Sequence, residues 1–137
     1  MRIVIDSNRV IASLIKDSTT RSLLFNKKFE FFAPSYIFSE INKYKSYIIK
    51  KVGINNADFD MLMKIIFENI SIISELEYEK SIKLLKEEIV DEKDLPYLSL
   101  AILIKANGIW THDPHFKEQN KIKTLTNIDL LNIVKTS

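Results

Sequence analysis

The sequence contains no cysteine among its 137 residues, which excludes disulfides, thiol catalysis and cysteine-based zinc sites. Only two glycines and three prolines occur, so long flexible linkers are not expected. No apolar run approaches the roughly 20 residues of a membrane-spanning helix, and three apolar residues before Asp6 are too few for a signal-peptide core. We therefore expect one domain over residues 1–137, in the cytoplasm and with no membrane partner.

No charge of one sign dominates either, because the formal net charge is only +2. This balance neither indicates nor excludes a nucleic-acid ligand, since a local basic face is compatible with it. Hydrophobic residues make up 46% of the chain, an ordinary share for a globular domain with a sizeable core.

Short apolar segments alternate with segments of helical periodicity along the whole chain. The expected strands are residues 2–6, 29–35, 71–75, 109–113 and 123–126. The expected helices are residues 9–16, 20–26, 36–51, 56–70, 78–89, 91–108 and 127–134. This order predicts an α/β fold, a three-layer α/β/α sandwich around a parallel sheet of about five strands.

Two of the expected strands end on a carboxylate. Asp6 follows "IVI" and Asp113 follows "IWTH". Each residue can cap the next helix, but ligands of open α/β sheets bind at the carboxyl ends of the strands. Because the carboxyl ends of parallel strands share one edge, Asp6 and Asp113 are expected to be neighbours.

Two further acids occupy the inward faces of their helices. Glu40 lies beside the apolar face of the helix expected at 36–51, although its head can equally reach water. Asp94 precedes Leu98 and Ile102 at helical spacing, and it can also cap the helix that contains Pro96. Its neighbour Asp91 is expected to serve only as a turn or cap residue.

Four acids on one inward edge repel one another, and a divalent cation is the natural compensation. Oxygen ligands without cysteine or paired histidines favour Mg²⁺ or Mn²⁺ over Zn²⁺. Such a cation can activate water and neutralise charge on a phosphodiester.

The segments "VIDSN", "SYIFSEI", "VDEKDLPYLSLAI" and "IWTHDPHF", in this order, resemble the PIN-domain family, and in particular VapC-like ribonuclease toxins. The resemblance spans nearly the whole chain and implies a PIN-like fold and a metal-dependent endoribonuclease. It implies Asp6, Glu40, Asp94 and Asp113 as the metal-binding, catalytic acids. The supporting residues that it implies are Ser7, Asn8 and Thr111.

The resemblance also implies RNA as the substrate and an antitoxin as a candidate partner. Arg9 departs from the family pattern, which usually has an apolar residue there, and an exposed surface position is the favoured interpretation. Lys43, Lys50 and Arg9 are candidate RNA contacts, although lysines on a solvated face are common. The apolar stripes of the helices expected at 56–70 and 78–89 serve either the core or a homodimer interface.

Three other interpretations remain open. A His-Asp phosphohydrolase would need more histidines than His112 and His115, and a phosphoaspartyl phosphatase would need an acid where Asn8 stands. A non-catalytic module that keeps the fold and binds RNA or protein is the main alternative, and retention of all four acids speaks against it.

Overall fold

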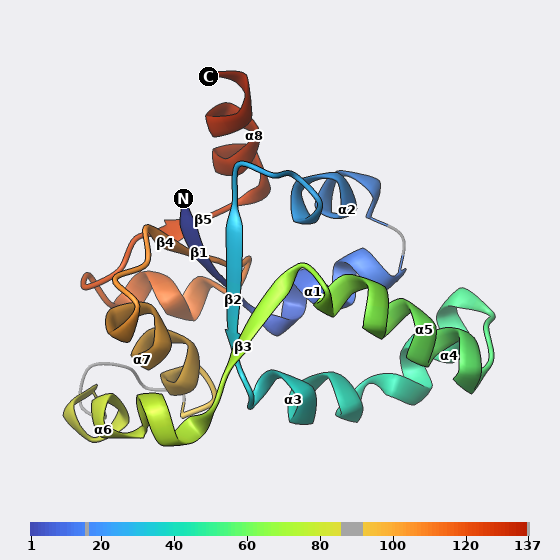
Figure 1. Cartoon of the computed structure of the whole chain (residues 1–137), viewed down its shortest axis with the longest axis horizontal. Coiled ribbons are helices and arrows are strands. Elements are labelled where there is room, and N and C mark those ends of the chain that lie inside the picture. The colour runs from blue at the N-terminus through green and yellow to red at the C-terminus, as the bar shows by residue number, and fades with distance from the viewer. Residues whose placement is uncertain (16, 86–91, 137) are drawn as a thin grey trace.

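Five short parallel strands form the sheet that organises the chain (Figure 1). The computed structural model describes residues 1–15, 17–85 and 92–136. The strands are β1 Arg2–Ile5, β2 Glu30–Pro34, β3 Ile70–Ile73, β4 Gly108–Trp110 and β5 Thr124–Leu125. The α-helices of the described residues are α1 Ser7–Ile15, α2 Ser18–Leu24, α3 Ile37–Lys43, α4 Lys45–Val52, α5 Asn56–Phe67, α6 Glu75–Leu85, α7 Leu95–Leu103 and α8 Asn127–Lys135. A short 3₁₀ helix, η1, covers Pro114–Glu118.

The sheet order is β3-β2-β1-β4-β5, with every neighbouring pair parallel. The predicted α/β/α sandwich with five parallel strands is therefore confirmed. From β1 the chain builds outward to β2 and β3 on one side, and it later returns to add β4 on the other. The gap between the ends of β1 and β4 is thus a topological switch point, where ligands of such sheets bind.

The core explains why β1 is so apolar. Ile3, Val4 and Ile5 are all 0% exposed, because β1 is paired on both edges and covered on both faces. Helix α7 packs against β1, β2 and β4, and α6 packs on α7. In Figure 1, α1 and α2 lie on the opposite side of β2 from α6 and α7.

The helix expected over residues 36–51 is divided into α3 and α4. Tyr44 lies between them, and its amide donates to the Ile41 carbonyl at 3.0 Å in a tightened turn. Neither glycine nor proline marks this break. The Tyr44 side chain at this break is 52% exposed, although the periodicity of a continuous helix over 36–51 would place it on the apolar face with Ile37 and Ile41.

Other boundaries differ by a few residues from the expectations. Helix α1 begins directly at Ser7, and Ile70 starts β3 instead of ending the apolar stripe of α5. Asn55 caps α5, and its side chain accepts from the Asp58 amide. Ile89 and Asp91, expected on a helix and at a cap, lie outside the described residues. None of the described helices combines the length and apolar character of a membrane span.

The sequence suggested that Gly108 ends a helix. In the structure it instead allows two strands to pack closely. Helix α7 ends at Leu103, and Gly108 is the first residue of β4. A Cβ at this position would lie 2.6 Å from Leu125 Cδ1 and 3.0 Å from the Lys123 carbonyl oxygen. The absence of a side chain therefore lets β5 approach β4.

Gly108→Ala is expected to lower the free energy of unfolding by about 1–3 kcal/mol, because the added methyl overpacks this contact. Urea unfolding measures the loss, and the Leu125 methyl resonances should shift. Gly53→Ala is the matched control: its φ of +76° is costly for alanine, but no atom lies within 4 Å of the added methyl. It should destabilise without moving Leu125. Wild-type stability of Gly108→Ala would contradict the packing account.

Candidate functional site

The ends of β1 and β4 bring two acidic segments together. Ile5 pairs with Trp110 in the parallel register, and the Asp6 amide donates to the Trp110 carbonyl at 3.0 Å. Asp6 therefore stands next to Thr111, with Asp113 two residues further on. Although more than 100 residues separate them in sequence, Asp6 and Asp113 lie at the same edge of the sheet.

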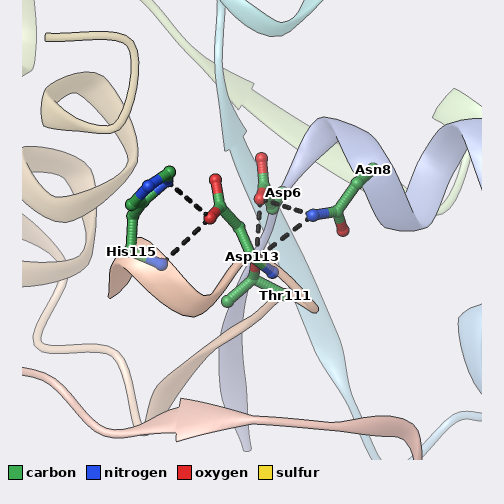
Figure 2. Close-up of polar contacts among 5 residues, drawn as sticks. All are labelled: Asp6, Asn8, Thr111, Asp113 and His115. Atoms are coloured by element: carbon green, nitrogen blue, oxygen red, sulfur yellow. Dashed lines mark hydrogen bonds and ion pairs between the residues drawn. The ribbon is translucent and has the colours of Figure 1, made fainter. Parts of the chain in front are cut away.

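Asp6 is only 5% exposed, and its carboxylate is held mainly by one oxygen. Oδ2 accepts from the Thr111 hydroxyl at 2.7 Å and from the Asn8 amide nitrogen at 3.0 Å (Figure 2). Oδ1 accepts a long bond, 3.4 Å, from the Ser7 hydroxyl, and the Ser7 amide also donates to this carboxylate. Because the two shorter side-chain bonds go to Oδ2, Oδ1 is the oxygen left more open to a ligand among the described residues.

Asp113 is held in a similar way by His115. The backbone amide and Nδ1 of His115 lie 3.0 Å and 2.9 Å from Asp113 Oδ1 (Figure 2). The first bond caps η1, so the predicted capping role of Asp113 is present. The Asp113 amide also donates to the Thr111 hydroxyl at 3.0 Å. Thr111 therefore connects the two acids, because its hydroxyl donates to one and accepts from the other.

Asp94, at the N-terminal end of α7, lies close to Asp113. It precedes the helix at the capping position, but its side chain makes no capping hydrogen bond. Instead, one ligand atom each of Asp94, Asp113 and His115 lies within 4.8 Å of the others. Asp94 is 5% exposed, so its position on the inward face agrees with the helical register that predicted it.

Glu40 approaches the group from α3. Its Oε1 accepts a short hydrogen bond from the Tyr97 hydroxyl, and Tyr97 is fully buried on α7. Burial, more than the neighbouring charges of Glu40 and Asp6, raises the pKa of the Tyr97 phenol. Tyr97 therefore stays protonated and holds the Glu40 carboxylate toward the other acids.

The charges of Glu40 and Asp113 act on the Asp6 carboxyl. Burial, together with the nearby charges of Glu40 and Asp113, raises the pKa of Asp6 to about 6 against the opposing hydrogen bond from Thr111. Burial also raises the pKa of Glu40. Charged carboxylates held this closely are costly without a cation.

A divalent cation fits this donor set. Asp6 and Asp113 each have one oxygen fixed by the protein and a second that can face an ion, and Asp94 adds a buried carboxylate beside Asp113. Carboxylate oxygens suit Mg²⁺ and Mn²⁺. The His115 nitrogen already lies 2.9 Å from Asp113, so His115 acts first as an orienting partner of that acid.

A comparison with protein families matches residues 4–131 to the PIN domain. The chain belongs to the PIN-domain family. PIN domains are generally metal-dependent nucleases, which agrees with an acidic group at this edge. None of the curated proteins matches the chain.

Two solved structures share the fold of this PIN domain. One is a chain of VapBC2 from Rickettsia felis, solved bound to a DNA fragment from their promoter, with 18% identity, a TM-score of 0.67, and coverage of 92% of this chain and 98% of that one. The other is a chain of a toxin–antitoxin complex from Klebsiella pneumoniae, with 16% identity, a TM-score of 0.66, and coverage of 91% and 97%.

A cavity of about 340 Å³ adjoins the acids of the PIN domain on the side of β5 and α8. Thr111 and Asp113 belong to both the cavity wall and the acidic edge. The other lining residues are His112, Pro114, Lys117, Thr124, Thr126, Asn127 and Ile128. A ligand in this cavity would therefore lie directly beside Asp113.

The expected basic residues differ in their surroundings. Lys43 and Lys50 are exposed, and the charge of Lys43 acts on Glu40. Arg9 is only 9% exposed, so its expected surface position is wrong. Asn8 and Asn127, from opposite ends of the chain, both accept hydrogen bonds from its guanidinium and so allow this low exposure.

The sequence interpretation did not identify three residues that complete the site. His115 appeared only as one of two histidines, Tyr97 only as part of an apolar helix, and Asn127 only as the start of the last helix. The Asn127 side chain accepts from Trp110 Nε1 at 2.9 Å and donates to the Thr20 hydroxyl at 3.0 Å. The one usable signal was a tyrosine in an otherwise aliphatic segment, since a buried hydroxyl needs a partner.

The raised pKa of Asp6 predicts how stability depends on pH without metal. Its folded pKa, about 6, exceeds the ordinary 3.8, so the protonated group favours folding below pH 4, and this contribution is lost as pH rises through 6. The shift corresponds to about 3 kcal/mol. Urea unfolding of the metal-free protein at pH 4.5 and 7 should show the decline, and Asp6→Asn should reduce it. Parallel pH curves for both proteins would contradict the assignment.

Proposed function

We propose that this PIN domain is a Mg²⁺- or Mn²⁺-dependent endoribonuclease that hydrolyses phosphodiester bonds of RNA in the cytoplasm. The observation that carries the proposal is the meeting of Asp6, Glu40, Asp94 and Asp113 at one sheet edge, with Asp6 and Asp113 each restrained through a single oxygen. The four acids are the proposed catalytic, metal-binding residues, supported by Ser7, Asn8 and Thr111.

A divalent cation held by these acids would supply a water of lowered pKa and neutralise charge on the phosphodiester. The protein's own residues orient its ligands. Thr111 and Asn8 fix the plane of the Asp6 carboxylate, His115 fixes Asp113, and Tyr97 fixes Glu40. Because these groups are already held in place, they need no rearrangement when substrate arrives. Such preorganisation is the main contribution of the protein in sites of this kind.

RNA is proposed as the substrate because the acids are flanked by surfaces that suit a single strand. On one side, the exposed Lys43 lies near enough to Glu40 to influence its charge, and Lys50 continues the basic side chains along α4. On the other side, the cavity beside Asp113 is large enough for a nucleotide base, with Lys117 on its wall. Lysine contacts to phosphate would make binding sensitive to salt and tolerant of sequence.

A protein partner of the antitoxin type is the second part of the proposal. Its support is a groove of about 390 Å³ between α3 and α5, lined by Phe38, Ser39, Ile41, Asn42, Phe59 and Met63. Phe38 is 42% exposed there and its ring packs on Phe67, with the ring centroids 4.8 Å apart. A homodimer through the apolar stripes of the helices expected at 56–70 and 78–89 remains a prediction.

Cleavage of single-stranded RNA should require added Mn²⁺ and stop with chelator. Asp94→Asn should lower the cleavage rate at least about 100-fold, a larger loss than for an outer ligand partner, because it removes charge that holds the cation. Asp60→Asn, on the exposed face of α5, is the matched control and should cleave as wild type. The cleavage rates of all three proteins are measured with labelled RNA, and thermal melts check their folding.

Two results would contradict this proposal. Equal cleavage in chelator would exclude the metal mechanism. RNA binding by the wild-type protein, without cleavage of any tested substrate in Mn²⁺, would favour the non-catalytic module.

The partner proposal predicts a short open reading frame beside the coding sequence. Its product, co-expressed with the PIN domain, should form a complex and lower RNA cleavage. Phe38→Asp should weaken that complex about 10-fold or more, since a charge in an apolar groove is costly to bury. Leu76→Asp, at a 79% exposed position on α6, is the control. Equal binding of both variants, measured by calorimetry, would exclude the groove.

A further inference from the structure

Arg9 is a buried arginine that contacts Asn8, one of the residues that bind Asp6. It lies in the first turn of α1 and is 9% exposed, which is unusual for arginine unless its donors are satisfied. Its Nε donates to Asn8 Oδ1 at 3.0 Å, and Nη1 donates to Asn127 Oδ1 at 3.5 Å. Asn127 also accepts from the buried Trp110, so Arg9 is held from behind by a fixed group.

The contact between Arg9 and Asn8 has a direction. A guanidinium can only donate hydrogen bonds, whereas a primary amide has an accepting oxygen and a donating nitrogen. Arg9 therefore holds the Asn8 oxygen on its own side and turns the Asn8 nitrogen toward the acids. That nitrogen donates to Asp6 Oδ2 at 3.0 Å and to the Thr111 hydroxyl at 3.3 Å (Figure 2).

The opposite orientation of the amide would be unfavourable for the site. The Asn8 oxygen would then face the Asp6 carboxylate, so two acceptors would meet. The Thr111 hydroxyl would also lose one donor and could turn its own proton to Asn8 instead of Asp6. The orientation imposed by Arg9 therefore acts on both donors to Asp6 Oδ2, directly on the Asn8 amide and through Asn8 on the Thr111 hydroxyl.

We propose that Arg9 is a positioning residue that locks the Asn8 amide, so that Asp6 presents Oδ1 to a divalent cation. This inference rests on the proposed function, because it takes Asp6 as a cation ligand. It assigns the departure from the family pattern at position 9 a role inside the site, through one intervening side chain and without contact to substrate.

A double-mutant cycle tests this role with Mn²⁺ alone as the probe. Mn²⁺ affinity is measured by electron paramagnetic resonance for the wild type, Arg9→Met, Asn8→Ala and the double variant. Arg9→Met should weaken Mn²⁺ binding about 10-fold, the usual effect of removing an outer partner of a ligand. Because Arg9 acts through Asn8, it should have almost no further effect when Asn8 is already alanine.

Two more variants separate positioning from charge and from general stability. Arg9→Gln places an amide nitrogen at the same distance along the side chain as Nε, so it keeps the donor without the positive charge. It should retain more Mn²⁺ affinity than Arg9→Met, and it serves as the test if Arg9→Met does not fold. Arg21→Met removes an arginine that binds the Ser13 and Leu14 carbonyls instead and should leave Mn²⁺ affinity unchanged.

Equal losses from Arg9→Met with and without Asn8 would overturn the proposal, as would equal affinities of Arg9→Gln and Arg9→Met. A wild type that binds Mn²⁺ but cuts no RNA would refute the nuclease while leaving this cycle interpretable. A wild type that binds no Mn²⁺ would overturn both proposals. If the wild type cleaves RNA and the effects of Arg9→Met and Asn8→Ala on Mn²⁺ affinity are additive, only the role of Arg9 is refuted.

Discussion

The hydrogen bond between the Asp6 amide and the Trp110 carbonyl is the contact on which the site depends. It ends the pairing of β1 with β4 and sets Asp6 beside Thr111. β1 and β4 are the neighbouring strands between which the switch point of the sheet lies. The same pairing that buries Ile3, Val4 and Ile5 therefore also creates the acidic edge. Core packing and site geometry are therefore consequences of a single register.

Buried acids at this edge work against stability. Burial and like charges hold the pKa of Asp6 well above its usual value, so the metal-free domain is strained by charges that it must keep for a cation. The surrounding residues limit the cost of burying these carboxylates by donating hydrogen bonds to one oxygen of each acid. The Thr111 hydroxyl, the Asn8 amide and the His115 backbone amide are uncharged donors, and this arrangement leaves room for the ion to supply the missing positive charge.

The sequence predicted the parts of the molecule that depend on local pattern. The end of β1 could be placed because its apolar residues stop at Asp6, and Asp94 could be placed from the register of Leu98 and Ile102. The end of β4 was placed too late, because this strand ends at Trp110 and not at Asp113. The break at Tyr44 could not be predicted, because no glycine or proline causes it. The burial of Arg9 also escaped prediction, since it depends on Asn127, which is 118 residues away in sequence.

The most direct test of this account is a crystal structure of the protein soaked in Mn²⁺, with the ion located by anomalous scattering. The account predicts an ion coordinated by Asp6 through Oδ1, together with Asp94 and Asp113, while Thr111 and Asn8 still bind Asp6 Oδ2. An ion bound at another surface, or one that displaces Thr111 and Asn8 from Oδ2, would contradict it.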